Sequence, residues 1–251
     1  MNLLLTNDDG YSAKGLNTLL KSLSSKHNVF VVAPESNRSA VSHCITMHKN
    51  LEIRQYEENV WSCSGSPVDC VVTALKSSLL PVKIDAVVSG INAGANIGTD
   101  ILYSGTCAAA REGALHGIPS VAFSLDNEGL ECSDFVHFDV LADFALKNLE
   151  TLVSLAKIER PYAFVNVNGL SIPKYKGVML TKALSTREYG DFVTLKQKED
   201  YCESIFQGGI PVSSCDVHSD YYACSKGYVA VSCVYAEPLA CNHVYGIKFS
   251  L

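Results

Sequence analysis

The sequence predicts an α/β fold with a doubly wound, mostly parallel sheet and a C-terminal antiparallel β extension. Up to about residue 170, short apolar runs alternate with segments of helical apolar periodicity, as in a parallel sheet covered by helices. Several of these runs end directly in polar, glycine-rich segments, which is where open α/β sheets carry their ligands. Beyond residue 171, strand-like runs follow one another without equally clear helices. The first part is therefore predicted to be Rossmann-like.

We divide the chain accordingly into a Rossmann-like α/β domain, residues 1–170, and a β-rich extension, residues 171–251, which closes on the core or serves as an oligomerisation arm. The 251 residues are 47% hydrophobic and 18% charged, enough for a substantial core. The formal net charge of -6 argues against binding of a nucleic-acid polymer. We find neither a membrane-spanning run nor an export signal, and expect a cytoplasmic protein whose 10 cysteines are reduced thiols.

The first predicted strand, residues 3–5, runs into the sequence Asn7-Asp8-Asp9-Gly10. Two adjacent carboxylates repel each other unless a cation or a proton lies between them. A hard cation such as Mg²⁺ or Mn²⁺, which prefers oxygen ligands, would relieve the repulsion. The same four residues also suit a solvated turn, and this alternative stays open at this point.

A second strand is predicted at residues 28–33, where Pro34 stops it. The polar segment that follows, residues 35–43, is long for a plain connection and indicates a functional loop with Ser39 in it. Residues 51–56 and 60–63 are expected to pair as a hairpin. The next helix is expected to start at Ser66, with serine as its cap and proline at its first position.

Another buried strand is predicted at residues 86–89, and a loop rich in glycine and asparagine follows it. Ser104-Gly105-Thr106 then starts a helix that continues through residues 108–115. Free backbone N–H groups and the positive end of the helix dipole make such a start a natural seat for an anion. Many helices begin with serine or threonine and bind nothing, so an ordinary cap is the alternative.

A strand, a long helix and another strand are expected next along the chain. The first strand covers residues 120–124, Asp134 caps the helix, and residues 163–167 form what we expect to be the last strand of the main sheet. Further strands are predicted at residues 177–181, 191–195 and 228–232. A protruding hairpin in this region would serve either oligomerisation or as a flap over the site.

Oxygen ligands without an evident core role gather in the loops that follow the predicted strands. Parallel strands would bring these loops to one edge of the sheet. These oxygen ligands are Asp8 and Asp9, Ser39, and Asn92 with Asn96, and together they would suit Mg²⁺ or Mn²⁺. The helix start at Ser104-Gly105-Thr106 would then place an anionic group opposite the metal. This set suits a phosphate ester, since its anionic oxygens can engage both a metal and a helix start.

Five motifs follow one another along the first half of the chain. They are Thr6-Asn7-Asp8-Asp9-Gly10, Val31-Val32-Ala33-Pro34 with Asn37-Arg38-Ser39, Gly65-Ser66-Pro67-Val68-Asp69-Cys70-Val71, Ser89-Gly90-Ile91-Asn92-Ala93-Gly94-Ala95-Asn96-Ile97-Gly98, and Tyr103-Ser104-Gly105-Thr106. In this order they resemble the SurE survival-protein family of nucleotidases. The dense part of the resemblance ends near Leu125, and it recovers weakly at Asp220 and at Lys226-Gly227-Tyr228-Val229.

The resemblance implies a metal-dependent phosphomonoesterase acting on nucleoside 5′-monophosphates, and in the family also on 3′-monophosphates and short polyphosphate. It implies one divalent metal ion per subunit, Mg²⁺ or Mn²⁺, held by Asp8, Asp9, Ser39 and Asn92. The family's phosphate contacts fall at Asn96, Ser104, Gly105 and Thr106. The family also forms dimers and tetramers through C-terminal strand exchange, so we expect a homodimer or homotetramer. The expected catalytic residues are Asp8, Asp9, Asn96 and Ser104.

Three questions stay open at this stage. Asp9 acts either as a ligand alone or also as base or nucleophile. His43 acts either as the general acid for the leaving hydroxyl or as a packing residue. A nucleotide-binding or regulatory protein without hydrolysis is the alternative function, because glycine-rich loops alone would permit it. The acidic pair argues against that alternative, since two carboxylates beside a phosphate require a metal.

Overall fold

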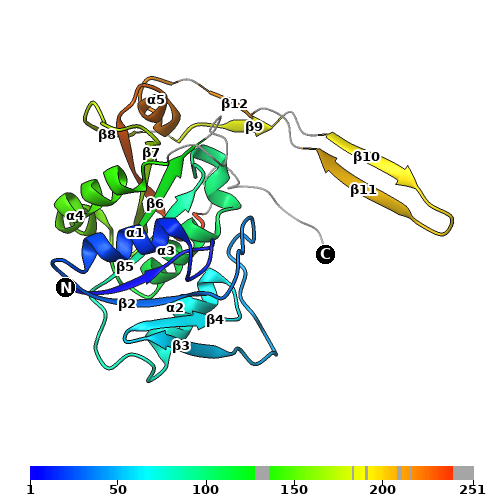
Figure 1. The fold of residues 1–251 in the computed structure, drawn as a ribbon. Coiled ribbons are helices and arrows are strands. Elements are labelled where there is room, and N and C mark those ends of the chain that lie inside the picture. Colours follow the sequence, from blue (N-terminus) through cyan, green and yellow to red (C-terminus); the bar gives the residue numbers. More distant parts are fainter. Residues whose placement is uncertain (128–135, 183, 190–191, 208–210, 215, 240–251) are drawn as a thin grey trace, which may run out of the picture.

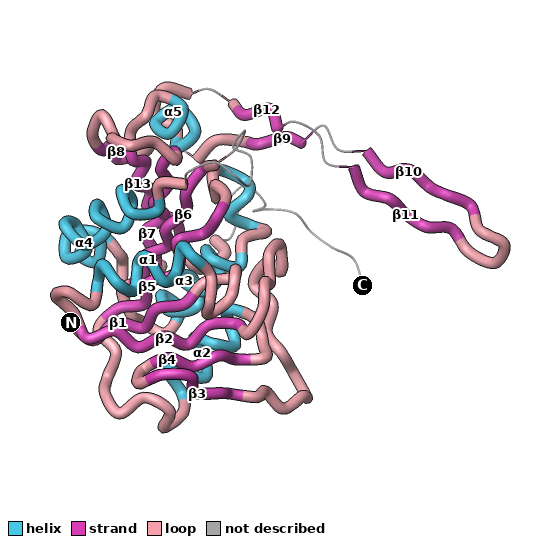
Figure 2. Tube along the Cα trace, viewed as in Figure 1, coloured by secondary structure: helices cyan, strands magenta, loops and turns pink. Residues whose placement is uncertain are grey.

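The computed structural model describes residues 1–127, 136–182, 184–189, 192–207, 211–214 and 216–239. Its centre is a nine-stranded sheet in the order β3-β4-β2-β1-β5-β6-β7-β13-β8 (Figures 1 and 2). The strands of this sheet are β1 Asn2–Thr6, β2 Asn28–Pro34, β3 Ile53–Glu57, β4 Val60–Cys63, β5 Ala86–Ala93, β6 Ser120–Asp126, β7 Ala163–Leu170, β8 Val178–Leu180 and β13 Val229–Tyr235. The six neighbouring strands β4, β2, β1, β5, β6 and β7 run parallel to one another.

Helices cover both faces of the sheet, so the predicted α/β, doubly wound class is confirmed. One face packs on α1 (Lys14–Leu23) and α4 (Phe138–Leu155), in a core that includes Leu3, Leu19 and Leu141. The other face packs on α2 (Pro67–Lys76) and α3 (Gly105–Leu115), in a core that includes Leu4. Alternate leucines of β1 thus face opposite layers, as a strand buried on both faces requires.

The predicted local elements between residues 50 and 76 are confirmed. β3 and β4 pair antiparallel as the expected hairpin. The helix α2 starts after Ser66, whose hydroxyl accepts the N–H of Asp69, while the Asp69 carboxylate accepts the N–H of Ser66. This reciprocal pair satisfies two backbone N–H groups that the first turn would otherwise leave without a partner.

One prediction about the sheet is wrong: β7 is not its last strand. β13 pairs with β7 antiparallel, and β8 then pairs with β13 in parallel. The chain reaches this place only after α5 (Asp220–Ser225), a short helix that the sequence pattern did not predict. The long helix α4 begins at Phe138, and the expected cap Asp134 lies outside the described residues. The division at residues 170 and 171 stays a prediction.

The predicted antiparallel extension is confirmed by two separate ribbons. β9 (Arg187–Tyr189) pairs with β12 (Pro211–Ser213), and β10 (Phe192–Gln197) pairs with β11 (Cys202–Gln207). Figure 1 shows β10 and β11 projecting away from the body of the molecule. Across the residues that the structure describes, no helix combines the length and the apolar character that a membrane span requires.

Candidate active site

Asp8 lies at the carboxyl end of β1, directly against the first turn of α3. The Thr106 hydroxyl donates to Asp8 Oδ1 at 2.5 Å, and the Thr106 backbone N–H donates to Asp8 Oδ2 at 3.2 Å. A Cβ at Gly105 would lie 2.8 Å from the Cβ of Asp8, so only glycine allows the helix to approach this closely. The acidic corner and the predicted phosphate seat are therefore in direct contact.

The Asp8 carboxyl is buried at a place where ionisation is unfavourable. Burial raises its pKa to about 6, and the charge of Asp9 adds to the increase, while the hydrogen bonds from Thr106 oppose it. Burial also raises the pKa of Asp9. Two adjacent carboxyls whose pKa values are both raised form a site that a cation would stabilise.

Asp9 connects the ends of three strands. Its Oδ2 accepts the N–H of Ala93 at the end of β5, at 3.1 Å, and its Oδ1 accepts the side-chain amide of Asn37 at 3.3 Å. The Asn37 Oδ1 in turn accepts the N–H of Ser39 at 2.9 Å, so one asparagine holds the loop after β2 against the acidic corner. We did not single out Asn37 from the sequence, although it stands within one of the motifs that carry the resemblance.

Asn92 and Ser104 lie on the elements that flank this corner. Asn92 stands near the end of β5, and its side-chain amide donates to the Gly94 carbonyl at 2.9 Å, which orients its oxygen. The hydroxyl of Ser104 accepts the N–H of Cys107 at 3.0 Å and caps α3. Thr106 directs both of its donors to Asp8. The roles of these residues toward metal and phosphate stay predictions.

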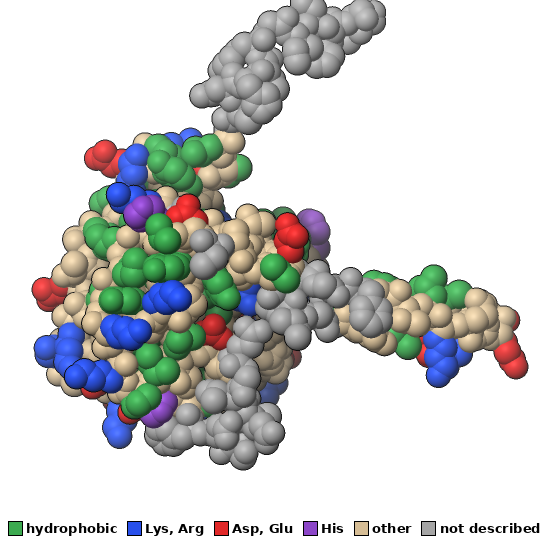
Figure 3. Space-filling model, turned by 90° about the horizontal axis from the view of Figure 1, so that it is seen from above, with side chains coloured by type: hydrophobic (Ala, Val, Ile, Leu, Met, Phe, Trp, Pro, Cys, Tyr) green, Lys and Arg blue, Asp and Glu red, His purple; other side chains and the backbone are tan. Residues whose placement is uncertain are grey.

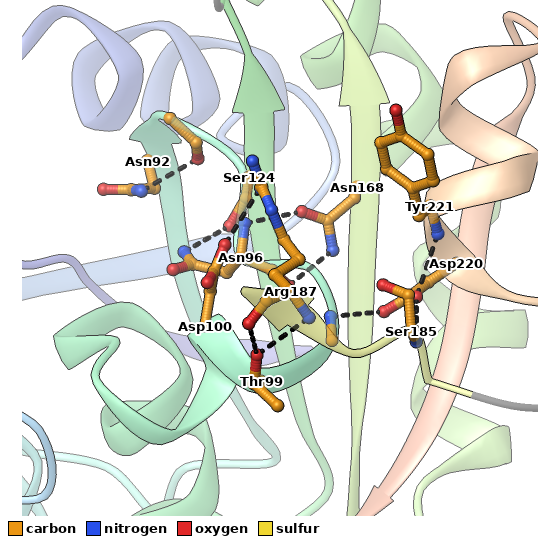
Figure 4. A network of polar contacts seen from close by, with 12 residues as sticks. Asn92, Asn96, Thr99, Asp100, Ser124, Asn168, Ser185, Arg187, Asp220 and Tyr221 are labelled. Atoms are coloured by element: carbon orange, nitrogen blue, oxygen red, sulfur yellow. Dashed lines mark hydrogen bonds and ion pairs between the residues drawn. The ribbon is translucent and has the colours of Figure 1, made fainter. Parts of the chain in front are cut away.

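Asn96 is held by a buried polar network at the ends of β6 and β7 (Figure 4). Its side-chain amide donates to the Ser124 hydroxyl at 2.7 Å, and its N–H donates to Asn168 Oδ1 at 2.9 Å. The side-chain amides of Asn166 and Asn168 both donate to the Asn96 carbonyl. The backbone of Asn96 is thus held by side chains that are themselves fully buried.

Ser124, Asn166 and Asn168 were missed in the reading of the sequence. Their signal was visible, because Asn166 and Asn168 alternate with Val165 and Val167 in a buried strand, where polar side chains need partners. The partner, however, comes from a loop 70 residues earlier, and a strand pattern contains no information about it.

His43 and His116 both contact the carboxylate of Glu112 on α3. His43 Nε2 lies 2.8 Å from Glu112 Oε2, and His116 Nε2 lies 3.1 Å from Glu112 Oε1. The hydrogen bond from His43, burial and the charges of the two histidines act on Glu112, with the net result that its pKa is lowered. His43 therefore holds the loop after β2 on α3, and its role as a general acid stays a prediction.

The donor chemistry of the acidic corner fits a hard divalent cation. Within the described ranges, histidine, cysteine and acidic side chains do not gather in groups of three around a common point. The residues that could hold a metal here are Asp8 and Asp9 through carboxylate oxygens, with neutral oxygens from the predicted ligands Ser39 and Asn92. Such an all-oxygen set is typical of Mg²⁺ and Mn²⁺ rather than of zinc.

A protein-family model described as "Survival protein SurE" matches residues 3–190. The chain belongs to the SurE family. A relative named 5′-nucleotidase SurE from Treponema pallidum is 42% identical over 192 residues, which cover 74% of this chain and 99% of its own. Another of the same name, from Desulfitobacterium hafniense (strain DSM 10664 / DCB-2), is 37% identical over 243 residues, which cover 94% of this chain and 92% of its own.

A solved structure of a SurE protein, from Aquifex aeolicus, is also similar to this chain. It has a TM-score of 0.78 at 30% sequence identity, and the match covers 94% of each chain. The resemblance inferred from the motifs is therefore confirmed for the family, and the fold of this SurE chain matches a member of it over most of its length.

Proposed function

We propose that this chain is a divalent-metal-dependent 5′-nucleotidase that hydrolyses nucleoside monophosphates to nucleoside and phosphate. One observation carries the proposal: the first turn of α3 donates two hydrogen bonds to Asp8, so an anion seat and a pair of adjacent carboxylates share one corner. The names of the SurE relatives support the same activity. We extend the proposal to 3′-monophosphates and short polyphosphate as secondary substrates.

The metal ligands in this proposal are Asp8, Asp9, Ser39 and Asn92, with one Mg²⁺ or Mn²⁺ ion per subunit. When bound, such an ion would act as a Lewis acid toward a phosphate oxygen and lower the pKa of a bound water. The chain's own task is to hold both carboxyls in place and to favour their ionised forms. The hydrogen bonds from Thr106 do this for Asp8, and the Ala93 N–H does it for Asp9, whose other oxygen accepts the Asn37 amide.

The phosphate contacts in this proposal are Asn96, Ser104, Gly105 and Thr106. The positive end of the α3 dipole, the Ser104 hydroxyl proton and the Asn96 amide would stabilise the equatorial oxygens as charge develops on them. The network around Asn96 supports this role, because donors that are fixed beforehand need no reorganisation during the reaction. Asp9 is the candidate base or nucleophile, if a carboxylate takes part beyond ligation.

The test is release of inorganic phosphate from a nucleoside monophosphate by the purified protein, after chelation and after addition of Mn²⁺ or Mg²⁺. We expect activity that requires the ion and that Asp8→Asn or Asp9→Asn nearly abolishes without unfolding the protein. Full activity of either variant would exclude the proposed site. A panel of nucleotides, polyphosphate and metals would rank the substrates and the ions.

A nucleotide-binding or regulatory protein that does not hydrolyse its ligand remains the second candidate. Nucleotide binding measured by calorimetry, with no phosphate release in any metal, would favour it. Against it stands the repulsion between Asp8 and Asp9, because a site built only to hold an anion would not place two carboxylates there.

We further propose that the chain assembles as a homodimer or homotetramer in the cytoplasm. The β10–β11 hairpin supports assembly, since an isolated two-stranded ribbon is marginally stable in water and this one exposes large apolar side chains (Figure 3). Val193, Leu195 and Phe206 are more than half exposed. Light scattering with size-exclusion chromatography would give the mass, and a monomer at micromolar concentration would exclude the proposal.

A further inference from the structure

The segment just before β9 lies against the loop that carries the proposed phosphate contacts. That loop runs from Asn96 through the 3₁₀ helix η1 (Gly98–Leu102) to Ser104. The contacting residues, Ser185 to Arg187, come more than 80 residues later in the chain and lead into β9, and Figure 4 shows Ser185 and Arg187 beside this loop. What this segment does for the site deepens the proposed function and rests on it.

A buried ion pair joins the two segments. Arg187 Nη1 lies 2.9 Å from Asp100 Oδ2, and the two side chains are 6% and 11% exposed. The Asp100 carbonyl accepts the N–H groups of Tyr103 and Ser104, at 3.0 and 3.1 Å. Asp100 therefore connects the guanidinium of Arg187 directly to the backbone at the start of α3.

Thr99 forms a second connection between the two segments, in which its hydroxyl is both donor and acceptor. Its hydroxyl donates to the Arg187 carbonyl at 2.9 Å and accepts the Arg187 N–H at 3.1 Å. The backbones meet closely one residue earlier, where a Cβ at Gly98 would lie only 2.0 Å from the Ser185 carbonyl oxygen. The loop can hold this place only with glycine at that position.

Asp220 at the start of α5 links both backbones from a third element. Its two oxygens accept the N–H of Gly98 at 2.7 Å and the N–H of Ser185 at 2.8 Å, and the residue is fully buried. Two residues before Gly98, the Asn96 backbone is held by Asn166 and Asn168. The loop is thus fixed near Asn96, in its middle and near Ser104, and the last two attachments depend on the C-terminal region.

We infer that Arg187 and Thr99 are positioning residues that hold this loop, and Ser104 at its end, in the geometry of phosphate transfer. Neither residue needs to touch the substrate for this role. Displacement of pre-organised donors by about 1 Å can cost roughly 100-fold in rate. Since such donors contribute most in the transition state, their displacement lowers kcat more than it raises KM.

The first test compares single variants of the full-length protein in metal-dependent phosphate release. We expect Thr99→Val and Arg187→Met to lower kcat roughly 10- to 100-fold with a much smaller change in KM. Thr99→Ser, which keeps the hydroxyl, should restore most of the activity. Arg54→Met is the matched control, because Arg54 forms an exposed ion pair with Glu52 on the far edge strand; it should leave kcat unchanged.

The second test is a double-mutant cycle with Ser104→Ala. If Arg187 acts through Asp100 on the end of the loop, Arg187→Met should cost far less in kcat/KM when the Ser104 hydroxyl is already removed. Strictly additive losses, or an unchanged kcat in both Thr99→Val and Arg187→Met, would overturn the inference. If Arg187→Met does not fold, the kcat of Thr99→Val alone tests the inference. An inactive wild-type protein would instead overturn the proposed function, and the inference with it.

Discussion

Thr106 gives both its hydroxyl and its backbone N–H to the two oxygens of Asp8. The hydrogen bonds favour the ionised carboxylate, against the burial that raises its pKa. A carboxylate held in this way keeps a fixed orientation toward a cation, as the partners of metal ligands commonly ensure.

We expect Thr106→Val to weaken metal binding about 10- to 100-fold, because loss of the hydroxyl removes the shorter of the two bonds to Asp8. Thr106→Ser keeps the donor and should stay close to the wild type. Titration of Mn²⁺ against phosphate release would give the apparent affinity. Equal affinities for the valine and serine variants would show that the hydroxyl does not orient Asp8.

In the metal-free protein, Asp8→Asn should raise stability at neutral pH. The pKa of Asp8 is 3.8 for a free side chain and about 6 here, so stability falls as pH rises from about 4 to 6. This full increase in the pKa of Asp8 corresponds to about 3 kcal/mol in the free energy of unfolding. Denaturant unfolding in chelator should therefore show the variant gaining stability over the wild type at pH 8 and little at pH 4.

Asp69→Asn is the control, because this substitution should change the stability at neutral pH in the opposite direction. Burial raises the pKa of Asp69, but hydrogen bonds from Thr46 and Ser66 outweigh it and hold the pKa below its usual value. Its contribution to stability is present at neutral pH and lost as pH falls below about 4. We expect this variant to be less stable than the wild type at pH 8. Asp8→Asn behaving in the same way would contradict the burial argument.

Gly105→Ala should abolish activity while the protein remains folded. Its new methyl group would lie 2.8 Å from the Asp8 Cβ and 3.2 Å from Pro67 Cγ, so the start of α3 must move away from the acidic corner. Gly113→Ala, in the same helix, meets Val87 and Ser120 instead. It should lower the melting temperature without lowering kcat. The comparison separates helix packing from the geometry of the corner.

His43→Gln should separate the two roles considered for His43. Glutamine can donate a hydrogen bond to Glu112 but cannot act as a general acid. If His43 only holds the loop, His43→Ala should lower stability and His43→Gln should restore it, with the basic limb of the pH–rate profile unchanged. Loss of that limb in both variants would identify His43 as the acid.

The pH dependence of stability gives an independent check on the same contact. The hydrogen bond from His43 is the largest of the influences that lower the pKa of Glu112 from 4.5. The stability that this pair provides is therefore present above pH 4.5 and lost as the pH falls through the lowered value. Unfolding curves at pH 6 and pH 3.5 should differ less for His43→Ala than for the wild type.

The sequence was sufficient wherever the signal was local. Apolar runs such as Leu3 to Leu5 predicted strands, and the pair Asp8 and Asp9 predicted an acidic corner, because both depend on neighbours in the chain. The placement of β13 beside β7 was not predictable in this way, since two strands of similar pattern compete for an edge. Arg187 was not predicted, and Asp220 was noted only within the resemblance and without a role, because their partners lie about 90 and 120 residues away.

The antiparallel pairing of β13 with β7 has a consequence for synthesis of the chain. Until residues 229–235 have left the ribosome, β7 presents a row of backbone N–H and C=O groups to water. An open edge of this kind can recruit strands from other molecules. We therefore expect a nascent or truncated chain that stops near residue 170 to aggregate more readily than the 251-residue chain, even though most of its parallel sheet is already in place.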